Sequence, residues 1–520
     1  MSGLGGAQNK ASMAAAWEGL RAMAPVTLAD LFAADSARPE AMTRRITWPV
    51  EPGSTAEAGM RIDFSKTHLS NEALSAFEAL ADAAGFAAAR EALFGGGIVN
   101  PTEGRAATHG AMRGSGTPAQ VEEADALHAR MELLIEAIHE GALGEIRHCI
   151  AIGIGGSALG PALAIDALTR DLALVDVHVV SNIDGLALEQ AFAACDPATT
   201  LIAVASKTFT TIETLTNATG ALTWLAQNGV EDPGGRVVAL TAAPEKAVEW
   251  GVDETRILPF PESVGGRYSL WSSIGFPVAL AVGMAEFRAM LAGAKAVDDH
   301  FRATEGRANA PLLAAFADQF YTRIKGCQTR AVFAYDERLA LLPDYLQQLE
   351  MESNGKSVMV DGSPVDGPTA PVTWGGVGTD AQHAVFQLLH QGTQLIPVDF
   401  IASIAPGDQL DPAHHRILLM NCLAQGAALM AGKSSDDPAR AYAGDRPSTT
   451  FLVDDCDAAA LGALIAFHEH RTFANAVLMG INPFDQFGVE LGKAIAKQIE
   501  SGEGQFDPST RALMAAAGLA

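Results

Sequence analysis

The stretch CIAIGIGGSALGPALAI, residues 149–165, decides how this chain folds. It carries no charged side chain, and about 17 residues is close to the lower limit for a membrane-spanning helix. Glycines, a serine and a proline fall in its middle, however, and these residues break a helix of that register. We therefore expect a buried strand, a tight turn and the start of a helix.

From about residue 145 onward, short β-branched runs alternate with longer helical stretches. The runs that we predict as strands are 146–154, 174–181, 199–206, 236–242, 256–260, 331–335, 357–362, 372–376, 394–403 and 449–455. Strands that alternate with helices imply right-handed crossover connections and mainly parallel sheets. Their continuous apolar character favours burial on both faces of each sheet.

The predicted fold class is therefore α/β, with two doubly wound, mainly parallel-sheet domains (α/β/α sandwiches) and an N-terminal helical extension. We place the boundaries near residues 125 and 285. Residues 1–125 would be a helical segment that packs on the larger domain. Residues 126–285 would form the first, smaller domain, and residues 286–520 the second, larger domain with C-terminal helices.

The composition limits the classes of function. Of the 520 residues, 48% are hydrophobic and 18% are charged, so the chain can bury a large core. With 61 acidic against 35 basic residues, its formal charge is −26. This charge argues against a nucleic-acid partner, because phosphate backbones are bound by Lys and Arg. It also opposes small anionic substrates unless a local site binds them.

The cysteines and the N-terminal residues indicate in which cellular compartment the protein works. The five cysteines are odd in number and far apart, and no CxxC pair exists. We therefore expect neither a disulfide framework nor a zinc ribbon. Residues 1–23 contain no apolar block that could serve as a signal-peptide core. We expect a cytoplasmic protein without a membrane partner.

Two loops that follow predicted strands have the composition of phosphate-binding segments. GIGGSALG (153–160) combines small residues with a helix start, where free backbone N–H groups and the helix dipole favour an anion. SKTFTTIET (206–214) places Lys207 among four hydroxyl side chains. Each loop alone is as consistent with a tight turn or an ordinary N-cap. Two such loops in one domain favour a single phosphate pocket.

Two further segments carry charged candidates, each with a plainer structural interpretation. GGRYSLWSSIGFP (265–277) holds Arg267, whose planar fork suits an oxyanion, although a solvated arginine is the commoner case. QQLEMESNGKS (347–357) holds Glu350 and Glu352 near a helix end. A glutamate there could be a general base, but most are simply exposed.

A helix is predicted within GGVGTDAQHAVFQLLHQGT (375–393), where His383, Gln387 and His390 share one face. Their spacing is not the HExxH pattern of zinc sites, so we expect no metal there.

The last segment is NPFDQFGVELGKAIAKQIES (482–501), also helical. Its polar face consists of Gln486, Glu490, Lys493 and Lys497. Such a face is also typical of a solvated helix with Glu/Lys pairs.

Together these six segments resemble the phosphoglucose isomerase family. The motifs IGIGGSALGP, SKTFTTIET, GGRYSLWSSIG, MESNGK, QHAVFQLLHQGT and QFGVELGK occur in the family's order from about residue 152 to 497. The resemblance implies two sugar-isomerase (SIS) domains, a homodimer with active sites near the subunit interface, and no cofactor or metal. It also implies interconversion of D-glucose 6-phosphate and D-fructose 6-phosphate through ring opening and an enediolate, in glycolysis and gluconeogenesis.

The resemblance also implies roles for single residues. Glu352 should move the proton between C1 and C2, and Arg267 should stabilise the enediolate. His383 and Lys493 should open the sugar ring, with His383 provided by the partner subunit. The phosphate ligands would be Gly156, Ser157, Ser206, Lys207, Thr208 and Thr211. The sugar ligands would be Gln348 and Gln486.

Two other interpretations stay open at this point. A non-catalytic SIS module could bind a sugar phosphate and regulate a partner, and it would need no catalytic base. An NAD-dependent oxidoreductase could use Gly153-x-Gly155-x-x-Ala158 as its dinucleotide loop. That match is loose, because Ser181 and Asn182 replace the acidic residue expected after the next strand.

Overall fold

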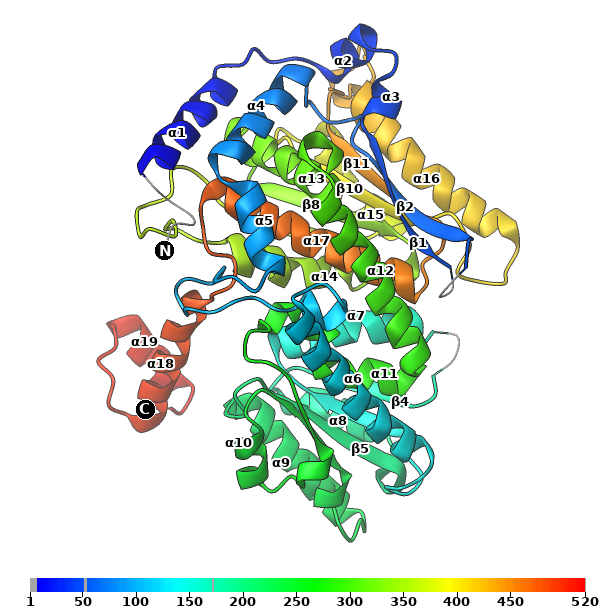
Figure 1. The fold of residues 1–520 in the computed structure, drawn as a ribbon, viewed down its shortest axis with the longest axis vertical. Coiled ribbons are helices and arrows are strands. Elements are labelled where there is room, and N and C mark those ends of the chain that lie inside the picture. Colours follow the sequence, from blue (N-terminus) through cyan, green and yellow to red (C-terminus); the bar gives the residue numbers. More distant parts are fainter. Residues whose placement is uncertain (1–6, 51–53, 171–172, 520) are drawn as a thin grey trace. The chain divides into compact units, whose positions relative to one another are not determined.

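The computed structural model describes residues 7–50, 54–170 and 173–519. They form two compact units, of which the larger ends at Pro483 and the smaller begins at Phe484. The smaller unit contains helices α18 (Glu490–Ser501) and α19 (Pro508–Ala516). The larger unit contains both β-sheets that the described residues form (Figure 1).

The first sheet of the larger unit is entirely parallel. In spatial order its strands are β4 (Asp176–Val180), β3 (His148–Ile152), β5 (Thr200–Ala205), β6 (Val237–Thr241) and β7 (Ile257–Pro259). Along the chain β3 comes first. The next strand, β4, pairs on one side of β3, and β5 pairs on its other side. The carboxyl ends of β3 and β5 therefore flank a topological switch point, where open α/β sheets bind their ligands.

Each of these strands lies within a run that the sequence predicted as a strand. The prediction succeeded because the central strands are apolar along their length; β5 and β6 are buried at every position. The helices that follow the strands are α7 (Leu159–Leu168), α8 (Gly185–Ala194), α9 (Ile212–Gln227) and α10 (Pro244–Trp250).

The second sheet combines parallel and antiparallel strands. In spatial order these are β1 (Thr43–Pro49), β2 (Glu57–Asp63), β11 (Ser448–Val453), β10 (Val398–Ser403), β8 (Thr329–Tyr335) and β9 (Val372–Val377). The last four run parallel, and the β1–β2 hairpin pairs antiparallel to β11. The predicted α/β class with mainly parallel sheets is confirmed.

The β1–β2 hairpin lies within the N-terminal segment, which the sequence predicted to be helical. In β1, the buried Ile46 and Trp48 alternate with the exposed Arg45 and the half-buried Thr47. This alternation is short and lies among charged residues, so its signal in the sequence is weak. Pairing of β2 with β11 joins the hairpin to the second sheet.

The strand predicted at 357–362 is wrong. The backbone N–H of Met359 donates to the carbonyl oxygen of Ser363 at 2.8 Å, and Gly362 has a φ of +81°. The segment therefore folds as a tight turn, despite its β-branched composition. The strand that pairs with β8 at this edge of the sheet is β9.

The other helices of the larger unit complete the fold. Before the first sheet come α1 (Ala7–Arg21), α2 (Leu28–Ala34), α3 (Arg38–Ala41), α4 (Asn71–Ala83), α5 (Phe86–Phe94) and α6 (Pro118–His139). After it come α11 (Phe276–Val282), α12 (Met284–Ala303), α13 (Ala310–Gln319), α14 (Leu342–Gln347), α15 (Gly378–Gln391), α16 (Pro412–Ala431) and α17 (Ala458–Met479).

Helix α17 forms much of the interior of the larger unit. It packs against α12 and α13, and Figure 1 shows it running beside both. Almost all of its side chains are buried. Even so, no helix in the described part of the chain combines the length and the apolar character needed to cross a membrane.

Candidate active site

The two predicted phosphate loops leave the same edge of the first sheet. Residues Gly155–Ser157 form a 3₁₀ turn between β3 and α7. Residues 206–211 connect β5 to α9. Because β3 and β5 pair in parallel, both loops begin at neighbouring carboxyl ends, at the switch point.

Gly156 brings the first loop against the segment that carries Arg267. A Cβ atom at Gly156 would lie 2.2 Å from the carbonyl carbon of Gly266 and 2.5 Å from the backbone nitrogen of Arg267. No side chain fits into that space, so a glycine is required here. The Ser269 hydroxyl also donates to the carbonyl oxygens of Gly156, at 3.3 Å, and Gly266, at 2.6 Å.

Lys207 connects the second loop to the same segment. Its Nζ donates to the carbonyl oxygens of Glu262, at 2.6 Å, and Val264, at 3.1 Å. Burial lowers the pKa of Lys207 to about 8, and the nearby cations Arg105 and Arg267 act in the same direction. An incoming dianion would favour the charged form of this amine.

Hydroxyl groups surround Lys207 in the second loop. The Ser206 and Thr211 hydroxyl oxygens lie 3.1 Å apart, and those of Thr208 and Thr210 lie 2.8 Å apart. Between them, Phe209 has a φ of +49°, a left-handed conformation that costs a residue other than glycine about 1–2 kcal/mol. The buried Phe209 side chain stabilises this conformation and so fixes the loop.

Arg267 is buried and oriented by several partners. Its Nε donates to the Ser353 hydroxyl at 2.6 Å, and its Nη2 donates to the carbonyl oxygen of Pro483. Its Nη1 lies 3.4 Å from Oε2 of Glu352. The side chain of Arg267 is 3% exposed and that of Glu352 is 22% exposed. A fixed cation therefore faces a carboxylate that solvent or substrate can reach.

The two glutamates of the fourth motif have different environments. Glu350 is buried; it pairs with Arg330 on β8 and accepts a hydrogen bond from Thr373 on β9 at 2.8 Å. It therefore anchors the π-helical turn Gln348–Glu352 to the second sheet. Glu352, two residues later, points to Arg267 instead. Single π-helical turns often occur at functional sites because they redirect side chains.

Gln348, at the start of that turn, lies against the first phosphate loop. A Cβ atom at Gly155 would be 2.9 Å from Nε2 of Gln348. The structure thus brings Gln348, Glu352 and Arg267 together with the loop that contains Gly156 and Ser157.

His383 lies on α15, which follows β9. Its side chain is exposed, whereas Phe386 and Leu389 on the same helix are buried. The helix places His390 seven residues later, where its Nε2 lies 3.0 Å from Oε1 of Gln425.

Gln486 and Lys493 belong to the smaller unit. Gln486 precedes the 3₁₀ turn Phe487–Val489, and Lys493 lies in the first turn of α18. Within α18, Glu490, Lys493 and Lys497 follow one another along one face.

Comparison with known proteins gives a consistent answer. The family described as Phosphoglucose isomerase matches residues 63–514. The chain belongs to the phosphoglucose isomerase family. It is 72% identical to a protein named glucose-6-phosphate isomerase from Erythrobacter litoralis, over 97% of this chain and 99% of the relative. It is also 69% identical to a protein of the same name from Novosphingobium aromaticivorans, over 97% of this chain and 98% of the relative.

A solved structure also matches along the whole chain. The crystal structure of a glucose-6-phosphate isomerase from Chlamydia trachomatis superposes with a TM-score of 0.86 at 27% identity and covers 100% of both chains. The phosphoglucose isomerase resemblance that the six motifs predicted is thus confirmed. The roles of the individual residues stay predictions.

Two residues within the phosphoglucose isomerase motifs were not singled out as candidates from the sequence. Ser353 accepts from Arg267, and the Tyr268 hydroxyl oxygen lies 3.0 Å from the Ser353 hydroxyl oxygen. The Tyr268 ring also lies 5.5 Å from the Arg267 guanidinium carbon. Their positions next to predicted site residues could have identified them, because Ser353 directly follows Glu352 and Tyr268 directly follows Arg267.

Proposed function

We propose that this chain interconverts D-glucose 6-phosphate and D-fructose 6-phosphate, an aldose–ketose isomerisation of glycolysis and gluconeogenesis. The observation that carries the proposal is the Glu352 carboxylate, 3.4 Å from Arg267 and next to two strand-end loops suited to phosphate. The family and the two bacterial relatives, both named glucose-6-phosphate isomerase, support the same substrate pair.

Glu352 is the base and then the acid of the reaction. The isomerisation moves one proton between neighbouring carbons, so a single carboxylate can remove it from C2 and return it to C1. The intermediate is an enediolate, whose negative charge develops on the sugar oxygens. Arg267, fixed by Ser353 and the Pro483 carbonyl, is oriented in advance to stabilise that charge. One such preorganised donor contributes about 3–4 kcal/mol.

The phosphate group positions the sugar. The loop with Gly156 and Ser157 and the loop with Ser206, Lys207, Thr208 and Thr211 supply backbone N–H groups, hydroxyls and one amine. Helices α7 and α9 begin directly after these loops, and helix N-termini favour anions. Binding of this remote group orients C1 and C2 at Glu352. Gln348 and Gln486 would contact the sugar hydroxyls.

Ring opening needs a second acid/base pair, which we assign to His383 and Lys493. His383 is exposed in the single chain, as expected for a residue that completes the site of a second subunit. We therefore propose a homodimer in which each active site takes its histidine from the partner. A cytoplasmic location and domain boundaries near residues 125 and 285 belong to the same proposal.

The decisive experiment is formation of fructose 6-phosphate from glucose 6-phosphate by the purified chain, with no metal or nucleotide added. The reverse reaction should proceed as well, and unphosphorylated glucose should not react. The Glu352→Gln variant, prepared identically, controls for a contaminating isomerase. A folded wild-type preparation without activity in either direction would overturn the proposal.

A further inference from the structure

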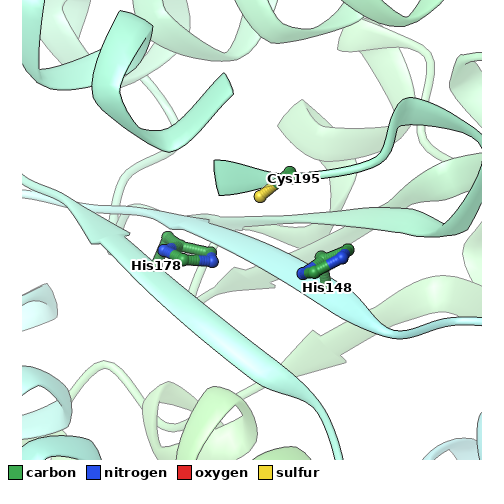
Figure 2. A group of neighbouring side chains, drawn as sticks. All are labelled: His148, His178 and Cys195. Carbon is green, nitrogen blue, oxygen red and sulfur yellow. The ribbon is translucent and has the colours of Figure 1, made fainter. Parts of the chain in front are cut away.

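A second group of reactive side chains lies away from the active site, in the first sheet. It consists of His148 on β3, His178 on β4 and Cys195, which follows α8. One ring nitrogen of each histidine and the cysteine sulfur all lie within 4.8 Å of one another. Figure 2 shows the Cys195 sulfur over the space between the two imidazole rings.

The strand register explains why the histidines meet. In the β3–β4 pair, His148 is opposite Asp176, and Ile150 is opposite His178. Side chains two residues apart point to the same face of a sheet, so His148, Asp176 and His178 share a face. His148 and Asp176 are the first residues of their strands. The group therefore lies toward the amino ends of the strands, whereas the phosphate loops follow their carboxyl ends.

One ring nitrogen of each histidine has no hydrogen-bond partner among the described residues. Nδ1 of His148 and Nε2 of His178 are both buried, and neither makes a hydrogen bond there. Burying such a nitrogen without a partner costs about 1–3 kcal/mol, so two of them in neighbouring side chains require an explanation. A metal ion between them would use both lone pairs.

We propose that His148, His178 and Cys195 bind one zinc-class divalent cation, with the Asp176 carboxylate as the fourth ligand. Imidazole and thiolate are the ligands that Zn²⁺ prefers, and four ligands complete its tetrahedron. An oxygen of Asp176 already lies 3.9 Å from Nδ1 of His148. The negative charges of one thiolate and one carboxylate would balance the charge of the ion.

The donor separations require a small local adjustment. Zn–N bonds measure about 2.0–2.1 Å and Zn–S bonds about 2.3 Å, so the ligand atoms of a tetrahedral site lie closer together than 4.8 Å. Rotation of the exposed Asp176 and the partly buried Cys195 side chains can supply this change. The bound ion would link β3, β4 and the end of α8.

This site departs from the expectation, based on the sequence, that the chain binds no metal. Its ligands are spread over residues 148–195 and match no short motif. Only the strand register brings them together. The site is separate from the residues assigned to isomerisation, so its test does not depend on the proposed function.

Titration of the full-length, metal-free protein with Co²⁺ tests the proposal. We expect one ion per chain, a near-ultraviolet thiolate-to-cobalt charge-transfer band, and displacement of Co²⁺ by Zn²⁺ with a Kd below about 1 µM. Cys195→Ala should abolish the band, and His178→Ala should weaken binding at least about 100-fold. The matched controls Cys327→Ala and His139→Ala change the same residue types outside the group and should bind like wild type.

X-ray absorption of the Zn²⁺-loaded wild-type protein keeps the test independent of whether the variants fold. One sulfur ligand and two imidazoles are expected at the metal. Absence of a sulfur ligand, a binding stoichiometry well below one, or an unchanged cobalt band in Cys195→Ala would each overturn the proposal. So would loss of the band in Cys327→Ala.

Discussion

Nη1 of Arg267 lies 3.4 Å from Oε2 of Glu352, although the two residues are 85 positions apart in the sequence. Ser353, the residue after Glu352, accepts a hydrogen bond from Nε of Arg267. The arginine is buried and the carboxylate is partly open. This pair therefore fits the proposed roles, in which Glu352 transfers the proton and the fixed charge of Arg267 stabilises the enediolate.

Glu352→Gln should remove turnover while the chain still binds sugar phosphate. The amide keeps the size of the side chain but cannot accept the C2 proton, so kcat should fall by about 10²–10⁴-fold or more. Steady-state kinetics and isothermal titration with a non-reacting sugar phosphate would measure the two effects.

Glu350→Gln is the matched control, two residues away in the same π-helical turn. It weakens the buried pair with Arg330, so its main effect should be a lower Tm. A Glu352→Gln enzyme with nearly wild-type kcat would show that another group is the base.

Arg267→Lys should lower kcat strongly even though it conserves the charge. Lysine lacks the planar fork that reaches Ser353, the Pro483 carbonyl and Glu352 together. Loss of one preorganised donor corresponds to about 10²–10³-fold in kcat. Ser353→Ala, which removes only the hydroxyl that accepts from Nε, should cause a smaller loss. The assignment fails if Arg267→Lys raises KM and leaves kcat unchanged.

Lys207 should give the reaction an alkaline limit. Its pKa of about 8 is below the ordinary value of 10.5, so the amine is charged below pH 8 and neutral above it. A phosphate dianion needs the charged form, and kcat/KM should therefore fall by about tenfold per pH unit above pH 8. At saturating substrate the bound dianion favours protonation, so kcat should fall at higher pH than kcat/KM.

Lys207→Met should raise KM and remove this alkaline limit from kcat/KM. Lys246→Met, at an exposed lysine on α10, is the matched control and should keep both KM and the pH profile of the wild type. An alkaline limit near pH 8 that persists in Lys207→Met would assign the titration to another group.

Arg113→Met should destabilise the larger unit. The fully buried Arg113 pairs with Asp298 on α12 and Glu469 on α17. Without the arginine, two carboxylates remain buried next to each other, and we expect a loss of about 3–5 kcal/mol in the free energy of unfolding. Denaturant unfolding would measure it.

Arg147→Met provides the comparison for that buried cluster. Arg147 pairs only at the surface with Glu145, at 2.6 Å, and both side chains are more than half exposed. Its loss should change stability by less than about 1 kcal/mol. Equal effects of the two substitutions would contradict a structural role for the buried cluster.

The strand-end loops and the family motifs could be predicted because each is contiguous in the sequence. The apolar runs of β3 and β5 identify the sheet, and the loops directly after them follow from the topology of such sheets. Contacts between distant segments could not be predicted in this way. The packing of Gly156 against Gly266 is an example, because it depends on how two loops fold back on each other.

Local pattern also failed to separate neighbouring residues with different roles. Glu350 and Glu352 look alike in the sequence, and only the partners Arg330 and Thr373 show that Glu350 is an anchor. The metal-ligand group is a second case, because β3–β4 register, and no motif, brings His148 and His178 together.

The partner-supplied histidine can be tested by mixing two inactive variants. His383→Ala lacks the proposed ring-opening group, and Glu352→Gln lacks the proposed base, so each homodimer should be inactive on glucose 6-phosphate. In a mixed dimer, one site combines the intact Glu352 of the first chain with the intact His383 of the second. Random exchange of an equal mixture should then restore about a quarter of the wild-type activity per chain, since half of the dimers are mixed and one of their two sites is complete. Mixing Glu352→Gln with a Glu352→Gln, His383→Ala double variant is the control and should restore nothing. If His383 acted within its own chain, every mixed site would lack one group, and the first mixture would stay as inactive as its components.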